Sequence, residues 1–189
     1  MPEIKGRQLA KSKIGGGKVS KQKIYEEGLE EHPKAAILLG NLMMLIWIAL
    51  GTIGCWLLHP LIAWVYLAFA VIMVGIVLRK LVCTSCYYYG KWCPIGWGKL
   101  SALVFKKADE SEFGKGLGFK LAPMTYGLLT LIPIVIIVVS FFIRSQFWVQ
   151  GVIILTLLLL VSAYSGTISR KKSCAKCKVR FMCPGSAAK

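Results

Sequence analysis

The chain has 189 residues, of which 56% are hydrophobic, and it carries a formal net charge of +16. Soluble domains have only about 45–50% apolar residues, so this composition excludes an ordinary soluble domain and predicts an all-α integral membrane protein. The positive charge also suits nucleic acid, but the basic residues flank apolar runs, where they meet anionic lipid headgroups. We therefore expect the lipid bilayer, and no nucleic acid, as the partner of these charges.

Residues 1–34 precede the first apolar run and are rich in lysine, with three consecutive glycines at 15–17. A segment with so few apolar residues cannot bury enough surface to offset the entropy of ordering. The sequence predicts a basic, largely disordered cytoplasmic tail here. Residues 24–33, at its end, are expected to add one helical turn ahead of the membrane.

Four uncharged apolar runs follow, at residues 35–58, 61–78, 121–143 and 147–166. Each is close to the roughly 20 residues with which a helix crosses the hydrocarbon core, and backbone groups in lipid must be hydrogen-bonded internally. Short turns separate the members of each pair. The chain is therefore predicted to be a four-helix membrane protein built from two tandem helical hairpins, one in repeat 35–120 and one in repeat 121–189.

The distribution of Lys and Arg predicts the orientation. Arg144, in the second short turn, is the one basic residue among 24 that lies at the outer side of this arrangement. Basic residues concentrate on the cytoplasmic side of membrane proteins. We expect a multi-pass protein of the cell membrane with both termini in the cytoplasm.

The segment between the hairpins is expected to hold a short helix lying on the membrane. Apolar residues recur there at helical spacing within residues 95–107, against lysines on the other faces. A docking surface for a partner protein is the alternative. Aromatic residues nearby suit either an aromatic belt at the headgroups or the wall of a low-dielectric pocket. They are Tyr87, Tyr88, Tyr89, Trp92 and Trp97.

Six of the seven cysteines form two triplets, one after each predicted hairpin. They are Cys83, Cys86 and Cys93, followed by Pro94, and Cys174, Cys177 and Cys183, followed by Pro184. The near-constant offset of about 90 residues between matching positions indicates a duplicated unit. A Cys-x2-Cys turn presents two sulfurs on one side of a loop, which suits a tetrahedral metal or one edge of an iron-sulfur cluster.

The residues around the triplets also suit metal chemistry. Nearby lysines and arginines are expected to favour thiolate over thiol and to offset the negative charge of a metal-thiolate centre. The predicted cytoplasmic location argues against stable disulfides. The second triplet lies in a tail that is too short and basic to form its own core, so metal or the first triplet must hold it. Cys55 is expected to be a small packing residue.

Several ligand sets fit the triplets. Cys83, Cys86, Cys174 and Cys177 could hold one zinc or one iron, with Cys93 and Cys183 outside the site. All six could instead hold two metals, since the Cys-x2-Cys-x6-Cys spacing resembles half of the fungal domain that binds two zinc ions through six cysteines. From that resemblance we take only the stoichiometry of two metals and six cysteines, and not the DNA binding of that domain. An iron-sulfur cluster is the third possibility, because each triplet ends in Cys-Pro, as do ferredoxin cysteine runs.

The sequence Cys93-Pro94-Ile95-Gly96 and, in part, Cys183-Pro184-Gly185 give the chain a local resemblance to four-helix membrane proteins of the NapH and NosR type. Those proteins carry Cys-Pro motifs after their second and fourth spans. The resemblance implies electron transfer at the membrane. The spacing of the paired cysteines differs from that family, and its additional ferredoxin-type clusters have no counterpart in the sequence.

We therefore expect a redox carrier or subunit, and not a stand-alone enzyme, with an iron-sulfur or iron site that exchanges electrons with a cytoplasmic or membrane protein partner. A structural zinc site in a membrane scaffold or assembly protein is the alternative, and a metal-handling or metal-sensing protein is a third. The predicted spans contain no charged residue, which argues against a pump or an ion pathway.

Overall fold

A computed structural model describes residues 24–110 and 113–188, so most of the predicted basic tail lies outside the described residues. Two helical pairs make up the fold. The first pair comprises α1 (Lys34–Trp56) and α2 (Pro60–Ile72), and α2 continues through the π-helical turns η1 (Met73–Val77) and η2 (Arg79–Cys83). The second comprises α4 (Leu117–Ile143) and, after the 3-10 turn η4 (Ser145–Phe147), α5 (Trp148–Ala163), η5 (Tyr164–Ser169) and α6 (Arg170–Ala175). The short helix α3 (Trp97–Val104) lies between the pairs.

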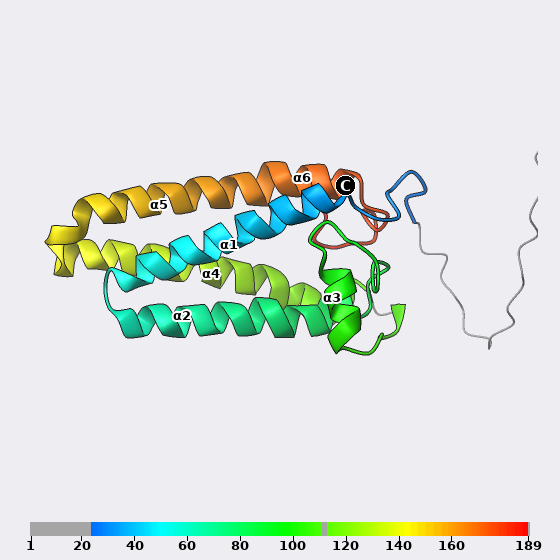
Figure 1. Ribbon diagram of the computed structural model, residues 1–189, viewed down its shortest axis with the longest axis horizontal. Coiled ribbons are helices and arrows are strands. Elements are labelled where there is room, and N and C mark those ends of the chain that lie inside the picture. Colours follow the sequence, from blue (N-terminus) through cyan, green and yellow to red (C-terminus); the bar gives the residue numbers. More distant parts are fainter. Residues whose placement is uncertain (1–23, 111–112, 189) are drawn as a thin grey trace, which may run out of the picture.

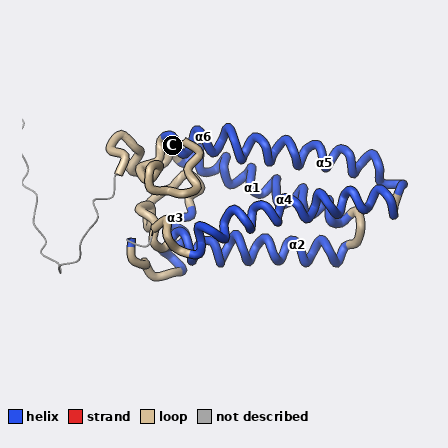
Figure 2. Tube along the Cα trace, turned by 180° about the vertical axis from the view of Figure 1, so that it is seen from behind, coloured by secondary structure: helices blue, strands red, loops and turns tan. Residues whose placement is uncertain are grey.

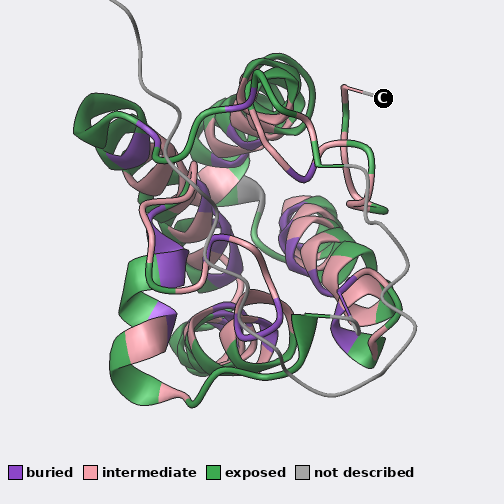
Figure 3. Ribbon diagram, turned by 90° about the vertical axis from the view of Figure 1, so that its right-hand side faces the viewer, coloured by how far each residue is buried: buried purple, intermediate pink, exposed green. Residues whose placement is uncertain are grey.

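Four continuous helices are long and apolar enough to cross a membrane, at Lys34–Trp56, Pro60–Cys83, Leu117–Ile143 and Trp148–Ala175. Their outer faces carry large apolar side chains: Leu61, Trp64 and Val65 on α2 are each more than 60% exposed. Figure 3, seen along the bundle, shows the buried residues on the faces that the helices turn toward one another. Such a surface is costly in water and is suited to lipid. The prediction of an all-helical fold, with four helices long and apolar enough to span a membrane, is confirmed for the described residues.

The bundle has two different ends (Figures 1 and 2). At the hairpin end, α1 turns into α2 and α4 turns into α5 through short connections. His59 caps α2 there by accepting a hydrogen bond from the Leu61 backbone. At the other end, called the cysteine end below, lie α3, α6, the start of α1 and the loops that carry both triplets. The chain thus returns to one end after each hairpin.

Small residues let the helices approach closely inside the bundle. Gly51 on α1 lies against the Tyr66 ring of α2, whose hydroxyl donates to the Leu129 carbonyl of α4 at 2.8 Å. Trp47 of α1 donates to the Ser162 hydroxyl of α5 at 3.0 Å. Close packing and such hydrogen bonds stabilise helix pairs in lipid, where the hydrophobic effect between helices is absent. Cys55 is fully buried in this core, as expected of a packing residue.

Two boundaries differ from the sequence-based expectation. The second and fourth spans continue past residues 78 and 166, to Cys83 and Ala175. Basic residues at their ends, such as Arg79 and Arg170, interrupt the apolar run without interrupting the helix, because long cationic side chains extend toward polar surroundings while the backbone stays helical. The first cysteine of each triplet therefore lies at a helix end and not in a free loop.

The helical turn expected within residues 24–33 is wrong. This segment, called the strap below, is a run of turns that makes one isolated parallel β-bridge between Leu29 and Cys177. Two of its backbone N–H groups bond to the second cysteine loop: Tyr25 donates to Lys178 and Leu29 donates to Lys176, each at 2.9 Å. Within the strap, Gly28 donates to the Tyr25 carbonyl in a single turn. Long-range pairing has replaced local helix formation.

Candidate functional site

The six predicted ligands all lie at the cysteine end. Cys83 ends the second span, and Cys86 and Cys93 lie in the first cysteine loop, residues 84–96. Cys174 lies in α6, and Cys177 and Cys183 lie in the second cysteine loop, residues 176–188. All six are partly buried, and none forms a disulfide in the described residues.

The two cysteine loops pack on each other around a small apolar cluster. Tyr88 of the first loop, Val179 of the second loop and Phe113 ahead of α4 form its buried centre. Cysteines from both triplets pack against this cluster, namely Cys86, Cys93, Cys177 and Cys183. The second loop, which is too short for a core of its own, is thus held against the first loop.

Cys86 lies near Cys83 and Cys93 of its own triplet and near Cys177 of the other, close enough for their charges to repel each other when the thiols are ionised. Cys177 has Cys174 and Cys183 as neighbours in the same sense. Cys86 and Cys177 lie 91 positions apart in the sequence, and both pack against the same apolar cluster. The fold therefore brings cysteines of both triplets near one another at the cysteine end.

Over residues 24–110 and 113–188, no three His, Cys, Asp or Glu side chains are already arranged as metal ligands. Some local contacts would nevertheless suit thiolate sulfur. Backbone N–H groups point at sulfur in both loops: the Tyr88 backbone bonds to Cys86, the Val179 backbone bonds to Cys177, and Gly98 donates to Cys93 at 3.4 Å. Hydrogen bonds of this kind stabilise coordinated thiolates and tune iron-sulfur centres.

Burial raises the pKa of the Cys86 and Cys177 thiols, and the neighbouring thiols raise it further. The expectation that surrounding cations make these cysteines thiolates is therefore wrong for these two residues, because desolvation of the charged form outweighs the opposing contacts. Without metal, both are protonated and weakly nucleophilic at neutral pH. A thiol-disulfide relay, which needs a reactive thiolate, is disfavoured at both positions.

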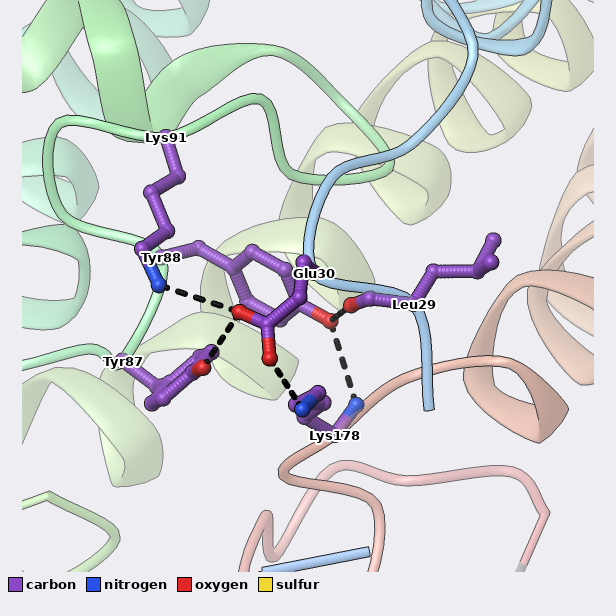
Figure 4. A network of polar contacts seen from close by, with 6 residues as sticks. All are labelled: Leu29, Glu30, Tyr87, Tyr88, Lys91 and Lys178. Atoms are coloured by element: carbon purple, nitrogen blue, oxygen red, sulfur yellow. Dashed lines mark hydrogen bonds and ion pairs between the residues drawn. The ribbon is translucent and has the colours of Figure 1, made fainter. Parts of the chain in front are cut away.

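The strap joins the two loops (Figure 4). The Glu30 carboxylate accepts a hydrogen bond from Tyr87 at 2.7 Å and pairs with Lys91 of the first loop at 3.2 Å and with Lys178 of the second loop. Beside it, the buried Tyr88 hydroxyl donates to the Leu29 carbonyl at 2.6 Å and accepts from the Lys178 backbone N–H at 3.1 Å. One carboxylate and one hydroxyl thereby contact both loops.

This arrangement corrects the assignment of two aromatic residues to a headgroup belt. Tyr88 is 1% exposed and Trp97 is 4% exposed, so both lie inside the protein. Trp97 donates to Asn41 of α1 at 3.2 Å, and the Arg79 guanidinium stacks on its ring at 4.4 Å. Trp97 fixes α3 against the bundle, whereas Tyr88 joins the first loop to the strap and the second loop.

Helix α3 has one face in the protein and one outside. Trp97, Gly98 and Ser101 are buried against the first loop and η2, whereas Leu103 and Val104 are exposed. The exposed pair suits a helix that rests on a membrane surface, as expected for residues 95–107. The buried face, through the Gly98 bond to Cys93, also supports the first triplet.

Sequence reasoning missed the contribution of the strap. Glu30 and Leu29 had no recognisable motif, and their partners lie about 60 and 150 residues away. His32, also in the strap, is buried beside the Tyr88 ring, with 5.8 Å between ring centroids. A single histidine in a polar segment gave no signal for this placement.

Comparisons with protein-family models, with curated proteins and with solved structures found no match to this chain.

Proposed function

We propose that the two cysteine triplets hold one shared metal-thiolate centre, iron-sulfur or iron, at the cytoplasmic surface of the cell membrane, and that the protein is an electron-transfer module. The observation that carries this proposal is the packing of Cys86 and Cys93 from one triplet, and of Cys177 and Cys183 from the other, against one buried apolar cluster. Six sulfur donors suit thiophilic metals and iron-sulfur clusters, and not hard cations such as magnesium or calcium.

The protein's own residues would bind and insulate such a centre. Cys83, Cys86 and Cys93 would supply one half of the ligands and Cys174, Cys177 and Cys183 the other half. Tyr88, Phe113 and Phe119 lie around the thiols and limit access of water. The backbone N–H groups of Tyr88, Val179 and Gly98 would bond to the coordinated sulfurs, which makes reduction easier by stabilising added negative charge.

The matching order of hairpin and cysteine triplet supports a duplicated architecture, in which each half supplies half of the ligands. Each second span of a pair also widens through π-helical turns just ahead of its triplet, at η1 and η2 in one half and at η5 in the other. A soluble donor or a membrane partner would exchange electrons with a centre placed at this surface.

A structural zinc site is the second candidate. The second cysteine loop contributes Val179 as its one strongly buried apolar side chain among the described residues. A loop with so small a core commonly needs a staple, and a tetrahedral zinc site with four cysteine ligands supplies one. In this case the protein is a scaffold whose two hairpins are clamped together.

Metal analysis separates the two candidates. The full chain would be purified in detergent without oxygen, and iron, zinc and acid-labile sulfide would be measured per chain together with the absorption spectrum. Iron with sulfide and a visible band that bleaches on reduction is the expected result. Zinc alone, in a colourless protein that shows no redox change, would favour the structural zinc site over electron transfer. Absence of both metals would refute the shared centre.

A further inference from the structure

His32 is a buried polar residue without a visible reason for its burial. Its side chain is 7% exposed, and its Nε2 atom is buried with no hydrogen-bond partner in the described structure. Buried polar atoms in native proteins are nearly always paired, and an exception often marks a bound ion or a functional group. The Nε2 atom of His32 is such an exception.

The strap places His32 against the first cysteine loop. Its backbone N–H donates to the Trp92 carbonyl, next to Cys93, at 2.9 Å. Its ring lies 5.8 Å from the ring of Tyr88, which packs against cysteines of both triplets. The positive charge of Lys176, next to Cys177, acts on the same imidazole. His32 is thus held beside the first loop, and the strap that carries it also contacts the second loop through Tyr25 and Leu29.

The state of the imidazole suits metal binding. Burial, with a smaller contribution from Lys176, lowers the pKa of His32 below its ordinary value. The ring is therefore neutral near pH 7, and neutral imidazole is the form that coordinates metals. Mixed sets of thiolate and imidazole occur both in structural zinc sites and in iron-sulfur centres of the Rieske type.

We propose that His32 is a ligand of the same centre, so that the ligand set is mixed cysteine and histidine and not cysteine alone. This inference rests on the shared metal site proposed above. Rotation about the two side-chain torsions of His32 moves Nε2 relative to the thiols without breaking the backbone bond to Trp92. The strap then has a chemical role: its contacts through Leu29 and Glu30 deliver a nitrogen donor to the site.

Cobalt substitution tests this proposal, because Co2+ replaces zinc or iron at such sites and its visible bands respond to the ligands. The full chain in detergent would be stripped of metal and titrated with Co2+ under reducing, oxygen-free conditions. His32→Gln is the test variant. His59→Gln is the matched control, since His59 lies at the hairpin end and accepts a hydrogen bond from the Leu61 backbone. Pulsed EPR of the wild-type Co2+ protein adds a readout that needs no variant.

The proposal expects nitrogen hyperfine coupling from a bound imidazole in the wild type. It also expects shifted visible bands and at least about tenfold weaker Co2+ binding in His32→Gln, with His59→Gln unchanged. His32→Cys should restore tight binding with an all-sulfur spectrum. Cobalt-thiolate bands without nitrogen coupling, and unchanged in His32→Gln, would overturn the role of His32 and leave the cysteine site standing. If the wild type forms no cobalt-thiolate bands and also holds neither iron nor zinc when purified without oxygen, both the role of His32 and the shared centre are overturned.

Discussion

The Tyr88 hydroxyl is the point at which the strap and both cysteine loops meet. It donates to Leu29 and accepts from the backbone of Lys178, and the ring around it is almost wholly buried. Burial raises the pKa of Tyr88 well above its ordinary range, so the hydroxyl keeps its proton and can act as donor and acceptor together. Loss of this single atom leaves two backbone groups without their partner.

Tyr88→Phe is therefore expected to loosen the second loop without changing the helices. An unsatisfied buried group costs about 1–3 kcal/mol, so the amide of Lys178 should exchange with solvent roughly ten- to a hundredfold faster. Hydrogen exchange measured by mass spectrometry in detergent checks this. Tyr89→Phe is the control, because it loses a bond to Phe105 that does not join the two loops. Equal exchange in both variants would contradict the bridging role.

Glu30 gives the strap a dependence on pH. Hydrogen bonds from Lys178, Tyr87 and Lys91 hold the pKa of this carboxyl at about 2, against an ordinary value of 4.5. A depressed acidic pKa means that the stabilisation is complete above about pH 4.5 and is lost as the pH falls toward 2. Exchange protection of the Leu29 amide, corrected for the intrinsic rate, should fall across this window.

In Glu30→Gln the carboxylate charge is absent at every pH, so the Leu29 amide should exchange faster than in the wild type already at pH 7. The same substitution at the exposed neighbour Glu31 serves as the control. High salt should weaken the wild-type contact as well, because Glu30 is 60% exposed and exposed ion pairs are screened. A wild-type profile that is flat between pH 4.5 and 2 would show that the ion pairs do not hold the strap.

At this scale the sequence predicts residue types better than residue partners. The six cysteines could be selected by their spacing alone, since that pattern is local. The buried position of Tyr88 could not be separated from Tyr87 and Tyr89, because three adjacent tyrosines have no periodicity. Glu30 and His32 gain their roles from contacts with loops far along the chain, which no local pattern encodes.

Helix α3 is the element that supports the first cysteine loop. Gly98, in its first turn, lies so close to this loop that a Cβ atom would stand 2.0 Å from the Tyr88 carbonyl oxygen. The close approach allows Gly98 to donate to Cys93 and to accept from Gly90, the latter at 3.0 Å. A side chain at this position is incompatible with the contact.

Gly98→Ala is expected to displace α3 and to expose Cys93. Overpacking typically costs about 1–3 kcal/mol, and the loss of the N–H bond to sulfur should accelerate alkylation of Cys93 by a maleimide. Gly127→Ala on α4 is the control, since no heavy atom outside its own helix backbone lies within 4 Å of the added methyl. If both variants react at the wild-type rate, α3 does not support the triplet.

The sequence predicts helices well where a long run of residues has a uniformly apolar composition. Four helices long and apolar enough to span a membrane are confirmed, because uncharged apolar runs of this length need no tertiary context to be recognised. Their ends at Cys83 and Ala175 could not be predicted, because Arg79 and Arg170 end the apolar run but not the helix. The strap lacks a helix because its amides bond to the second loop, a competition that local propensity does not describe.

The whole molecule is polar at one end and apolar along its length. The strap, both cysteine loops and α3 gather at the cysteine end. Of the 16 basic residues in the described part of the chain, 15 lie in segments that belong to this end, and Arg144 lies at the hairpin end. The positive-inside rule applied to this distribution predicts that the hairpin end lies outside the cell. The orientation can be tested by thiol labelling from outside the cell, because the native cysteines are not expected to react there.

Gln146→Cys, at the exposed turn between α4 and α5, should react with a membrane-impermeant maleimide in intact cells. The wild type should not react, since its triplets would face the cytoplasm and Cys55 is fully buried. After permeabilisation, the partly exposed triplet cysteines become accessible as well. If intact cells label the wild type through its triplets, and the substitution adds no further label, the orientation is inverted.

The claim that most needs a test is that the two triplets form one centre and not two. Metal per chain would be measured in the wild type, in Cys86→Ser, in Cys177→Ser and in the double variant, all purified in detergent without oxygen. One shared centre predicts a similar, nearly complete loss of metal in each single variant and no further loss in the double variant, because coupled sites are not additive. Loss of half the metal in each single variant and of the remainder in the double variant would contradict the shared centre.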